Sequence, residues 1–256
     1  MTDSLLAFLA PAGIVINLLI IAVLLAGLWL GLGRTKLDRR ARIGTWLLVA
    51  VPLLAWFVLT RTLGLAGVFQ ARPGIPPIPF AILLPLALGL ALLLRSRRIA
   101  EVIDAVPPSW LIGLQAYRVV GGVFLAFWLD GSLPGSFAIP AGGGDMLVGL
   151  EAIPVALYLA SGARGGRLAA YAWNIFGITD LVVAISLGFL TSPGIGHVLA
   201  LDNPNLLVTA YPLAMIPAFA VPLSLILHGL SLWQLRRQQP GRSNSTAIPQ
   251  AELNMA

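Results

Sequence analysis

Long apolar stretches alternate with short polar segments along the whole of this chain. A helix that crosses a bilayer needs about 20 apolar residues, with about 17 as a working minimum. Seven stretches reach or approach that length, at residues 5–32, 45–60, 79–94, 110–129, 145–161, 168–191 and 206–235. The second and third are short and contain Pro52 and Pro85, so a tilted or re-entrant pair is the alternative there. The pattern predicts an all-α, polytopic membrane helix bundle of about seven transmembrane helices.

The composition agrees with a protein whose solvent is the bilayer. Of the 256 residues, 58% are hydrophobic and 10% are charged, whereas soluble domains carry about 25% charged residues. A chain this apolar could not cover its own surface in water, so we expect the lipid bilayer to be its main partner. The chain contains no cysteine, which excludes disulfides, thiolate metal sites and thiol catalysis.

The basic residues gather in alternate connections between the predicted spans. Of the 16, Arg61 and Arg72 lie in the opposite connections and Arg118 lies inside a span. The others occupy the first, third and fifth connections and the tail: Arg34, Lys36, Arg39, Arg40, Arg42, Arg95, Arg97, Arg98, Arg164, Arg167, Arg236, Arg237 and Arg242. Cytoplasmic loops of membrane proteins are enriched in arginine and lysine. The distribution predicts that the N-terminus is outside and the C-terminus cytoplasmic, and these runs are orientation signals, not a nucleic-acid surface.

The polar residues inside the membrane divide the chain into unequal parts. Residues 1–108 hold three spans with almost no polar side chains and are predicted to be a scaffold half. Residues 109–237 hold four spans and all the intramembrane ionisable groups, and residues 238–256 are predicted to be a disordered cytoplasmic tail. The connections 131–144 and 192–205 are predicted to be outer loops that fold back on the bundle. Gly27 and Gly31 follow the spacing of a helix-contact motif, which makes a homo-oligomer an open alternative.

Arg118 carries the sharpest functional signal. It lies eight residues past Trp110, about 12 Å into the membrane at the rise of an α-helix, where a charged residue costs about 2.5–3.5 kcal/mol even on the mild insertion scale. Gln115, Arg118 and Gly122 follow the spacing of one helix face, which we expect to point toward other helices. Arg118 is either half of a structural salt bridge or an anion-binding or coupling residue.

Asp180 is the leading candidate partner for this arginine. It lies about midway along the sixth predicted span, where Asn174, Gly177 and Asp180 fall within one arc of the helix. A small residue between two polar ones is typical of a surface that lines a groove. A paired acid that only fixes helix packing is the equally good alternative.

Two further acids belong to the fifth predicted span. Asp145 is expected at its outer mouth, where it would be solvated or cap the helix, and Glu151 lies a turn and a half deeper. Burial disfavours an ionised carboxyl group and a nearby guanidinium favours it. Whichever acid Arg118 does not neutralise is therefore the better candidate for carrying a proton.

The seventh predicted span contains His228, with Ser224 and Ser231 at four residues before and three after. A serine and a histidine on one helix could form a nucleophile and base, but we favour serines bonded to their own helix carbonyls and a histidine in a packing hydrogen bond. This span also carries prolines that free backbone carbonyls and allow kinks, namely Pro212, Pro217 and Pro222.

Several known classes of membrane protein are excluded by missing residues. A retinal protein needs a lysine within a span, and the only lysine, Lys36, lies in a loop. A multi-haem cytochrome needs several intramembrane histidines, and His197 lies in an outer connection. The chain has neither an H-E-x-x-H run nor a phosphate-binding P-loop. No cofactor or metal is predicted.

Two segments carry a resemblance to other proteins. GDMLVGLEA at 144–152 and WNIFGITDLVVAISLGFLTSPG at 173–194 resemble uncharacterised bacterial multi-spanning membrane proteins. The resemblance covers mainly the last four spans and implies a bacterial inner-membrane protein with no particular activity.

Three hypotheses for function remain open. The first is a transporter or channel for a small solute or ion, with a pathway built from Gln115, Arg118, Asp145, Glu151, Asn174, Asp180 and His228. The second is a membrane-embedded enzyme that acts on a lipid or quinone through Glu151, Asp180 and His228. The third is a non-catalytic assembly or sensor protein held together by a bridge between Arg118 and an acid.

Overall fold

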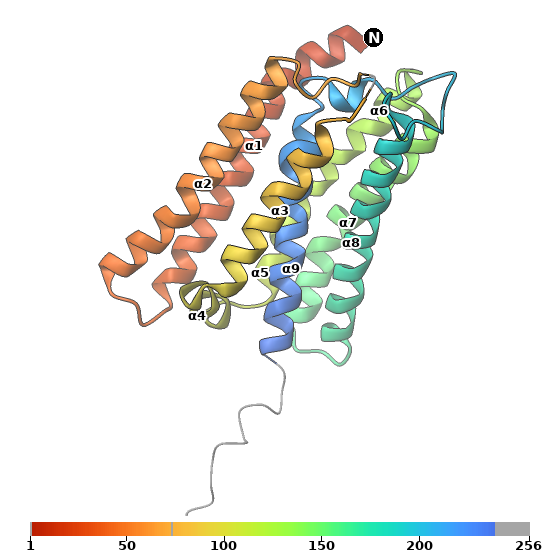
Figure 1. Cartoon of the computed structure of the whole chain (residues 1–256). Helices are drawn as coiled ribbons and strands as arrows, with labels where there is room; N and C mark the ends of the chain where they lie inside the picture. Colours follow the sequence, from red (N-terminus) through yellow and green to blue (C-terminus); the bar gives the residue numbers. More distant parts are fainter. Residues whose placement is uncertain (1, 73, 239–256) are drawn as a thin grey trace, which may run out of the picture.

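The computed structural model describes residues 2–72 and 74–238, which form a bundle of helices without any β-strand (Figure 1). Within these residues, seven helical segments are long and apolar enough to cross a membrane, which confirms the predicted fold class. They are α1 (Thr2–Gly33), α2 (Arg39–Leu65), α3 (Ile78–Arg95), the composite span Ser109–Leu129, α7 (Gly135–Ala160), α8 (Gly166–Thr191) and the composite span Ile216–Arg237. The second and third spans have 27 and 18 residues, so both can cross fully. Residues 239–256, most of the predicted tail, lie outside the described residues.

Two of the spans change their winding along their length. The fourth consists of α5 (Ser109–Gly113), the 3-10 helix η1 (Leu114–Gly122) and α6 (Val123–Leu129). The seventh begins with a π-helical turn, η3 (Ile216–Ala220), and continues as α9 (Val221–Arg237). The remaining elements are two short helices outside the spans, α4 (Arg97–Ala105) and η2 (Leu207–Thr209).

The fifth span begins ten residues earlier than the sequence predicts. Residues 135–144, expected to belong to an outer loop, form the first turns of α7 despite Pro140 and three consecutive glycines. Each glycine costs a helix about 1 kcal/mol, whereas a backbone group left unpaired in a membrane costs several kcal/mol. The helix therefore continues through the glycines. In contrast, residues 192–205 do form the predicted connection that folds back, since Val198 and Leu199 donate backbone hydrogen bonds to Leu190 of α8.

The seventh span begins ten residues later than predicted. Residues 206–215 form η2 and a series of turns, so Pro212 precedes the span and does not kink it. Pro217 lies in the π-helical turn η3, and Pro222 lies at the second position of α9, where its missing N–H leaves a carbonyl of η3 without that donor.

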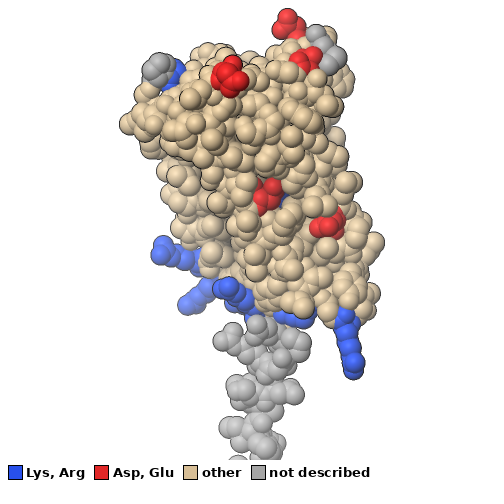
Figure 2. Space-filling view, turned by 90° about the vertical axis from the view of Figure 1, so that its right-hand side faces the viewer, with Lys and Arg blue, Asp and Glu red and all other residues tan. Residues whose placement is uncertain are grey.

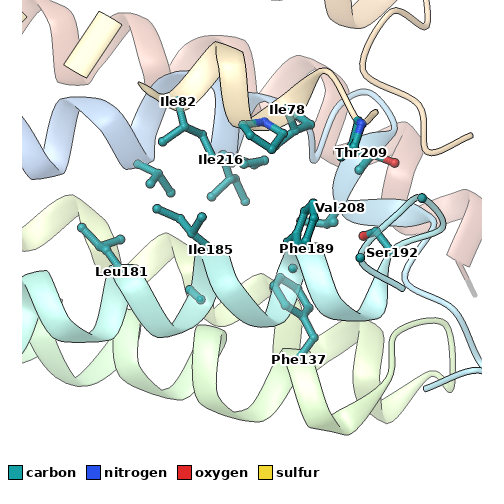
Figure 3. A pocket seen from close by; sticks show the side chains of 18 of the residues that line it. Ile78, Ile82, Phe137, Leu181, Ile185, Phe189, Ser192, Val208, Thr209 and Ile216 are labelled. Carbon is teal, nitrogen blue, oxygen red and sulfur yellow. The ribbon is translucent and has the colours of Figure 1, made fainter. Parts of the chain in front are cut away.

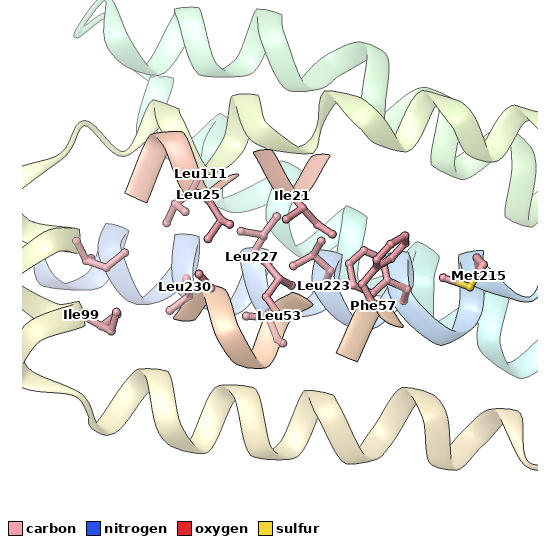
Figure 4. Packing of buried hydrophobic residues seen from close by; sticks show 14 residues of the cluster. Ile21, Leu25, Leu53, Phe57, Ile99, Leu111, Met215, Leu223, Leu227 and Leu230 are labelled. Atoms are coloured by element: carbon pink, nitrogen blue, oxygen red, sulfur yellow. The ribbon is translucent and has the colours of Figure 1, made fainter. Parts of the chain in front are cut away.

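The seventh span lies at the centre of the bundle and has the largest buried share of any span. Figure 4 shows the leucines of α9, among them Leu223, Leu227 and Leu230, packed among side chains from α1, α2 and α5. Phe219 of η3 stacks against Phe57 of α2 with ring centroids 5.4 Å apart. Through these contacts, the seventh span packs the other spans around the polar residues in the middle of the bundle.

The two ends of the bundle differ in charge. Figure 2 shows arginine and lysine side chains gathered at the end from which the tail leaves, and acidic side chains at the opposite end and within the apolar wall. We call these the tail end and the N-terminal end, after the chain terminus that lies at each (Figure 1). The basic connections counted in the sequence thus share one face of the protein.

Candidate functional site

Arg118 lies in the middle of the bundle and all five of its N–H groups have acceptors. Its Nε donates to Asp145 Oδ1 at 2.8 Å. Its Nη2 lies 2.7 Å from the same Asp145 oxygen and 2.5 Å from Asp180 Oδ2. Its Nη1 contacts the carbonyl oxygen of Gly177 at 3.2 Å and Nε2 of His228 at 3.1 Å. The arginine therefore joins η1, α7, α8 and α9.

A chain of hydrogen bonds behind the arginine fixes the state of His228. Asn174 Nδ2 donates to the Ala170 carbonyl at 2.8 Å and to Ser231 Oγ at 3.0 Å, which leaves its Oδ1 facing His228 Nδ1 at 2.9 Å. Because an amide oxygen only accepts, Nδ1 carries the proton and Nε2 presents a lone pair to Arg118. His228 is therefore a neutral acceptor within the cluster.

Four ionisable side chains of this site lie at one depth. The distance along each span to the N-terminal end of the bundle is ten to twelve residues, or about 15–18 Å at the rise of an α-helix, for Arg118, Asp145, Asp180 and His228. Asp145 was predicted at the mouth of its span, and this was wrong because α7 starts earlier. Asp145 is buried, with 7% of its surface exposed. We use the name Arg118 cluster for Arg118, Asp145, Asp180, Asn174 and His228.

Glycines on the facing helices make room for the charged groups. A Cβ atom on Gly121 would overlap the Asp145 carboxylate, and one on Gly144 would overlap the Asp180 carboxylate. A Cβ on Gly177 would lie 2.5 Å from the His228 ring and 3.1 Å from Arg118 Nη1. The sequence indicated only Gly177, because the roles of the other two depend on which helices meet.

The 3-10 winding of η1 decides which side chains accompany the arginine. With three residues per turn, Gln115, Arg118 and Gly121 lie on one buried face. The predicted member Gly122 packs against Met146 instead. Gln115 is fully buried, and neither polar atom of its amide has a hydrogen-bond partner in the described part of the chain.

The charges of the Arg118 cluster do not balance when both acids are ionised. One guanidinium faces two carboxylates, and the side chains are almost closed to solvent, with 1% exposure for Arg118, 10% for Asp145 and 8% for Asp180. In so apolar a setting a net charge is expensive. One proton or one small cation at the carboxylates would make the cluster neutral.

An apolar pocket leads from the N-terminal end of the bundle to Asp145. Its empty space, including the part that is open to the surroundings, is about 740 Å³. Figure 3 shows its walls, with Ile78 and Ile82 of α3 opposite Leu181, Ile185 and Phe189 of α8. Ser192 and Thr209 lie at the outer part of the pocket, which the connection 192–205 partly covers. We call it the entry pocket.

A second pocket of about 450 Å³ reaches the same cluster from the α1 side. Arg118 and Asp145 line it together with Asn17 and Tyr117, and the Tyr117 hydroxyl lies 2.7 Å from Ser224 Oγ. Asp145 thus borders both pockets.

Other predicted site residues have different surroundings. Glu151 is exposed on the outer face of α7, away from the Arg118 cluster, and has no hydrogen-bond or ion-pair partner among the described residues. The two serines beside His228 do not bond to their own helix, since Ser224 meets Tyr117 and Ser231 accepts from Asn174. Gly31 is buried against Val102 and Val106 of α4, so it packs within the chain. A homo-oligomer stays a prediction.

The sequence did not indicate the part played by Tyr117 and Asn17. Asn17 donates to the Gly13 carbonyl at 2.7 Å and borders the second pocket. A single polar residue in an apolar span was the available signal. The described residues contain no group of three or more acidic, histidine or cysteine side chains placed to hold a metal ion.

Comparison with known proteins gives a family and no activity. No curated protein and no solved structure matches the chain. Residues 75–236 match one family, described as a domain of unknown function, DUF8737. The matched region begins before α3 and ends in α9, so it contains the Arg118 cluster and leaves out α1 and α2. Since it covers more than half of the chain, this protein belongs to the DUF8737 family.

Proposed function

We propose that this membrane protein is a transporter that exchanges protons for a small, largely apolar cation. The observation that carries the proposal is the position of Asp145, which contacts Arg118 and also borders the entry pocket. A solute that enters this pocket meets apolar walls and then one carboxylate. Such a site suits an organic amine or another amphiphilic cation.

The charge of the Arg118 cluster couples the binding of a proton to the binding of the cation. With both carboxylates ionised, the cluster has one negative charge in excess of Arg118. A proton or a cationic solute can each remove that excess, but the two together would leave a positive charge in an apolar setting. Binding of one therefore opposes binding of the other, and this reciprocity is the thermodynamic basis of exchange.

The winding of the flanking segments supports a movable site. Arg118 lies on a 3-10 helix of nine residues, although such runs rarely exceed three or four residues. On the other side of the pockets, Ile216 and Pro217 lie in a π-helical turn. Short changes of winding occur at functional hinges. Conversion of η1 to an α-helix would shorten it by about 4–5 Å, from the difference in rise per residue.

We also propose an orientation for the protein from the charges at its two ends. The basic connections at the tail end support a cytoplasmic position for that end, so the entry pocket would open to the outside. The resemblance of residues 144–152 and 173–194 to bacterial membrane proteins supports the bacterial inner membrane as the location.

Flux through reconstituted protein tests the proposal. Proteoliposomes with an internal pH-sensitive dye would be exposed to a panel of monovalent cations from propylammonium to ethidium. We expect at least one cation to drive proton movement, and Asp145→Asn to reduce the rate at least tenfold. Asp145→Asn leaves Arg118 paired with Asp180, so the protein should stay folded.

Glu151→Gln is the matched control, because it neutralises an acid of the same helix that lies away from the cluster. Its flux should equal that of the wild-type protein. Absence of proton movement with every cation, or equal flux in Asp145→Asn and the wild type, would contradict the proposal.

A further inference from the structure

Helix α1 contacts the bundle at its two ends and through Ile21 and Leu25 in its middle, and leaves hollows beside these contacts. At the tail end, Leu32 is fully buried and packs with Val102 of α4 and with Val106, which follows this helix. At the N-terminal end, the hydroxyl of Thr2 donates to Asp130, which also accepts from Ser132 at 3.0 Å. The hydrogen bond from Thr2, and to a smaller extent that from Ser132, lowers the pKa of the Asp130 carboxyl below its usual value.

A groove made of adjoining hollows follows α1 between its two ends. Three adjoining hollows, of about 580, 450 and 1420 Å³, succeed one another from the N-terminal end to the tail end. All three are bordered by Ile16, and neighbouring hollows also share Asn17 and Ile20. Along α1 the groove runs from Leu9 to Leu30, which is about 31 Å at the rise of an α-helix.

That length equals the hydrocarbon thickness of a bilayer, about 30 Å. The walls are mostly aliphatic and aromatic, with side chains of α1 on one side and of η1 and the seventh span on the other. One leaflet accounts for about half of that thickness, so an acyl chain that enters from one end would occupy about half of the groove, and the apolar lining suits such a chain. Water in it would lack partners along most of its length.

An unpaired cation stands at the N-terminal end of the groove. Arg61 is partly buried in the last turns of α2 and borders the first hollow with Phe57 and Tyr211. Its Nε is buried without a hydrogen-bond partner, and it forms no ion pair with any described residue. A guanidinium has five donors arranged to bind an anionic oxygen group. The guanidinium of Arg61 has no such group among the described residues.

We infer that the α1 groove binds a phospholipid, with its phosphate at Arg61 and one acyl chain beneath α1. The charge of Arg61 selects an anionic headgroup, and its place at the end of a span matches the level of the headgroups. The lipid fills the space that α1 leaves open, and its chain passes the wall that contains Tyr117 and the Arg118 cluster. Arg118 and Asp145 border the middle hollow of this groove, and lipid binding there does not require cation exchange.

Native mass spectrometry of the protein purified in mild detergent tests this inference. We expect one phospholipid per chain to remain on the wild-type protein after exhaustive washing, and Arg61→Gln to lower its occupancy at least threefold. Arg72→Gln is the matched control, because Arg72 belongs to the same end of the bundle but is exposed and borders none of the three hollows. Its occupancy should not change.

A second pair of variants tests the acyl chain separately from the phosphate. Gly13 borders the first hollow and has open space around it, so Gly13→Phe should fill the groove without disturbing the packing. Gly33→Phe adds the same ring to α1 where there is also open space, outside the groove. We expect lipid loss from the first variant and full retention by the second.

Lipid add-back distinguishes a lipid from a free anion. Phosphatidylglycerol vesicles should restore occupancy and raise the melting temperature of delipidated wild-type protein, whereas inorganic phosphate should do neither. The inference fails if phosphate alone gives the same stabilisation, if the wild-type protein keeps no lipid, or if Arg61→Gln and Arg72→Gln lose lipid equally. Transport is not measured here, so this result and that of the flux assay can fail separately.

Discussion

At the scale of single residues, the two acids of the Arg118 cluster hold unequal positions. Asp145 Oδ1 contacts both Nε and Nη2 of the arginine, while Asp180 contacts Nη2 alone. Asp180 also lies opposite Gly144, whose missing side chain leaves space for that carboxylate. The geometry of the cluster therefore depends on a residue that forms no hydrogen bond to it.

The substitution Gly144→Ala tests this dependence. The added methyl group would displace the Asp180 carboxylate from Arg118, and we expect a loss of about 1–3 kcal/mol, the usual cost of overpacking. Thermal unfolding in detergent, followed by loss of the monodisperse peak, measures it. Gly143→Ala is the control, because the adjacent glycine has open space around it. Equal melting temperatures for the two variants would show that the carboxylate moves at no cost.

The sequence predicted part of this cluster and missed part for a definable reason. A buried arginine must have an acidic partner, and the position of Asp180 in the middle of its span identified that residue. Asp145 was misplaced because its depth was counted from the wrong helix start. The contribution of Gly121 could not be predicted, since it depends on the 3-10 winding that turns this residue toward α7.

At the scale of elements, η1 and α7 approach so closely that their backbones are nearly in contact. A Cβ on Gly149 of α7 would overlap the backbone nitrogen of Val119, and Arg118 directly precedes that residue. Unlike the end of a side chain, a backbone cannot turn aside. The close approach of η1 to α7 therefore requires a residue without a side chain at position 149.

We expect Gly149→Ala to cost about 3 kcal/mol in total, the upper end of the overpacking range, and therefore to destabilise the protein more than Gly144→Ala does. Because it pushes η1 outward, it should also weaken the contact between Arg118 and Asp145. Gly113→Ala is the control, since a methyl group there would make ordinary contacts of 3.7 and 3.8 Å with α7 side chains. Melting temperatures of the three variants, measured in one detergent, decide the order.

The number and type of the helices could be predicted from apolarity alone, but their boundaries could not. Residues 135–144 look like a loop because proline and glycine usually end helices, yet the membrane penalises any unpaired backbone there. The reverse error occurred at residues 206–215, where apolar side chains suggested a span and the backbone instead forms turns. Hydrophobicity reports burial and not backbone conformation, and both segments contribute buried apolar side chains, such as Phe137 and Leu213.

At the scale of the whole molecule, the structure separates charges between the two ends of the bundle and puts one charged cluster between them (Figure 2). An exposed ion pair at the tail end, Arg237 with Asp104 at 2.5 Å, contrasts with that cluster. Exposed pairs contribute about 0–1 kcal/mol, whereas removal of one partner from a buried pair costs about 3–5 kcal/mol.

The orientation can be tested cleanly because the chain has no cysteine of its own. Ala163→Cys lies in the exposed connection between α7 and α8 at the tail end, and Asp202→Cys lies in the exposed connection at the N-terminal end. We expect a membrane-impermeant maleimide to label Asp202→Cys in intact cells, and Ala163→Cys only after permeabilisation. The opposite pattern would reverse the predicted topology and the direction in which the entry pocket opens.

The depth at which Arg118, Asp145 and Asp180 lie in the membrane has an electrical consequence. A group halfway through the membrane lies inside the transmembrane voltage, and a full crossing by one charge exchanges about 2.3 kcal/mol per 100 mV. A proton that reaches Asp145 or Asp180 from either side therefore crosses about half of that voltage drop and gains or loses about 1.2 kcal/mol per 100 mV. The occupancy of the cluster is thereby tied to the energised state of the cell, before any solute arrives.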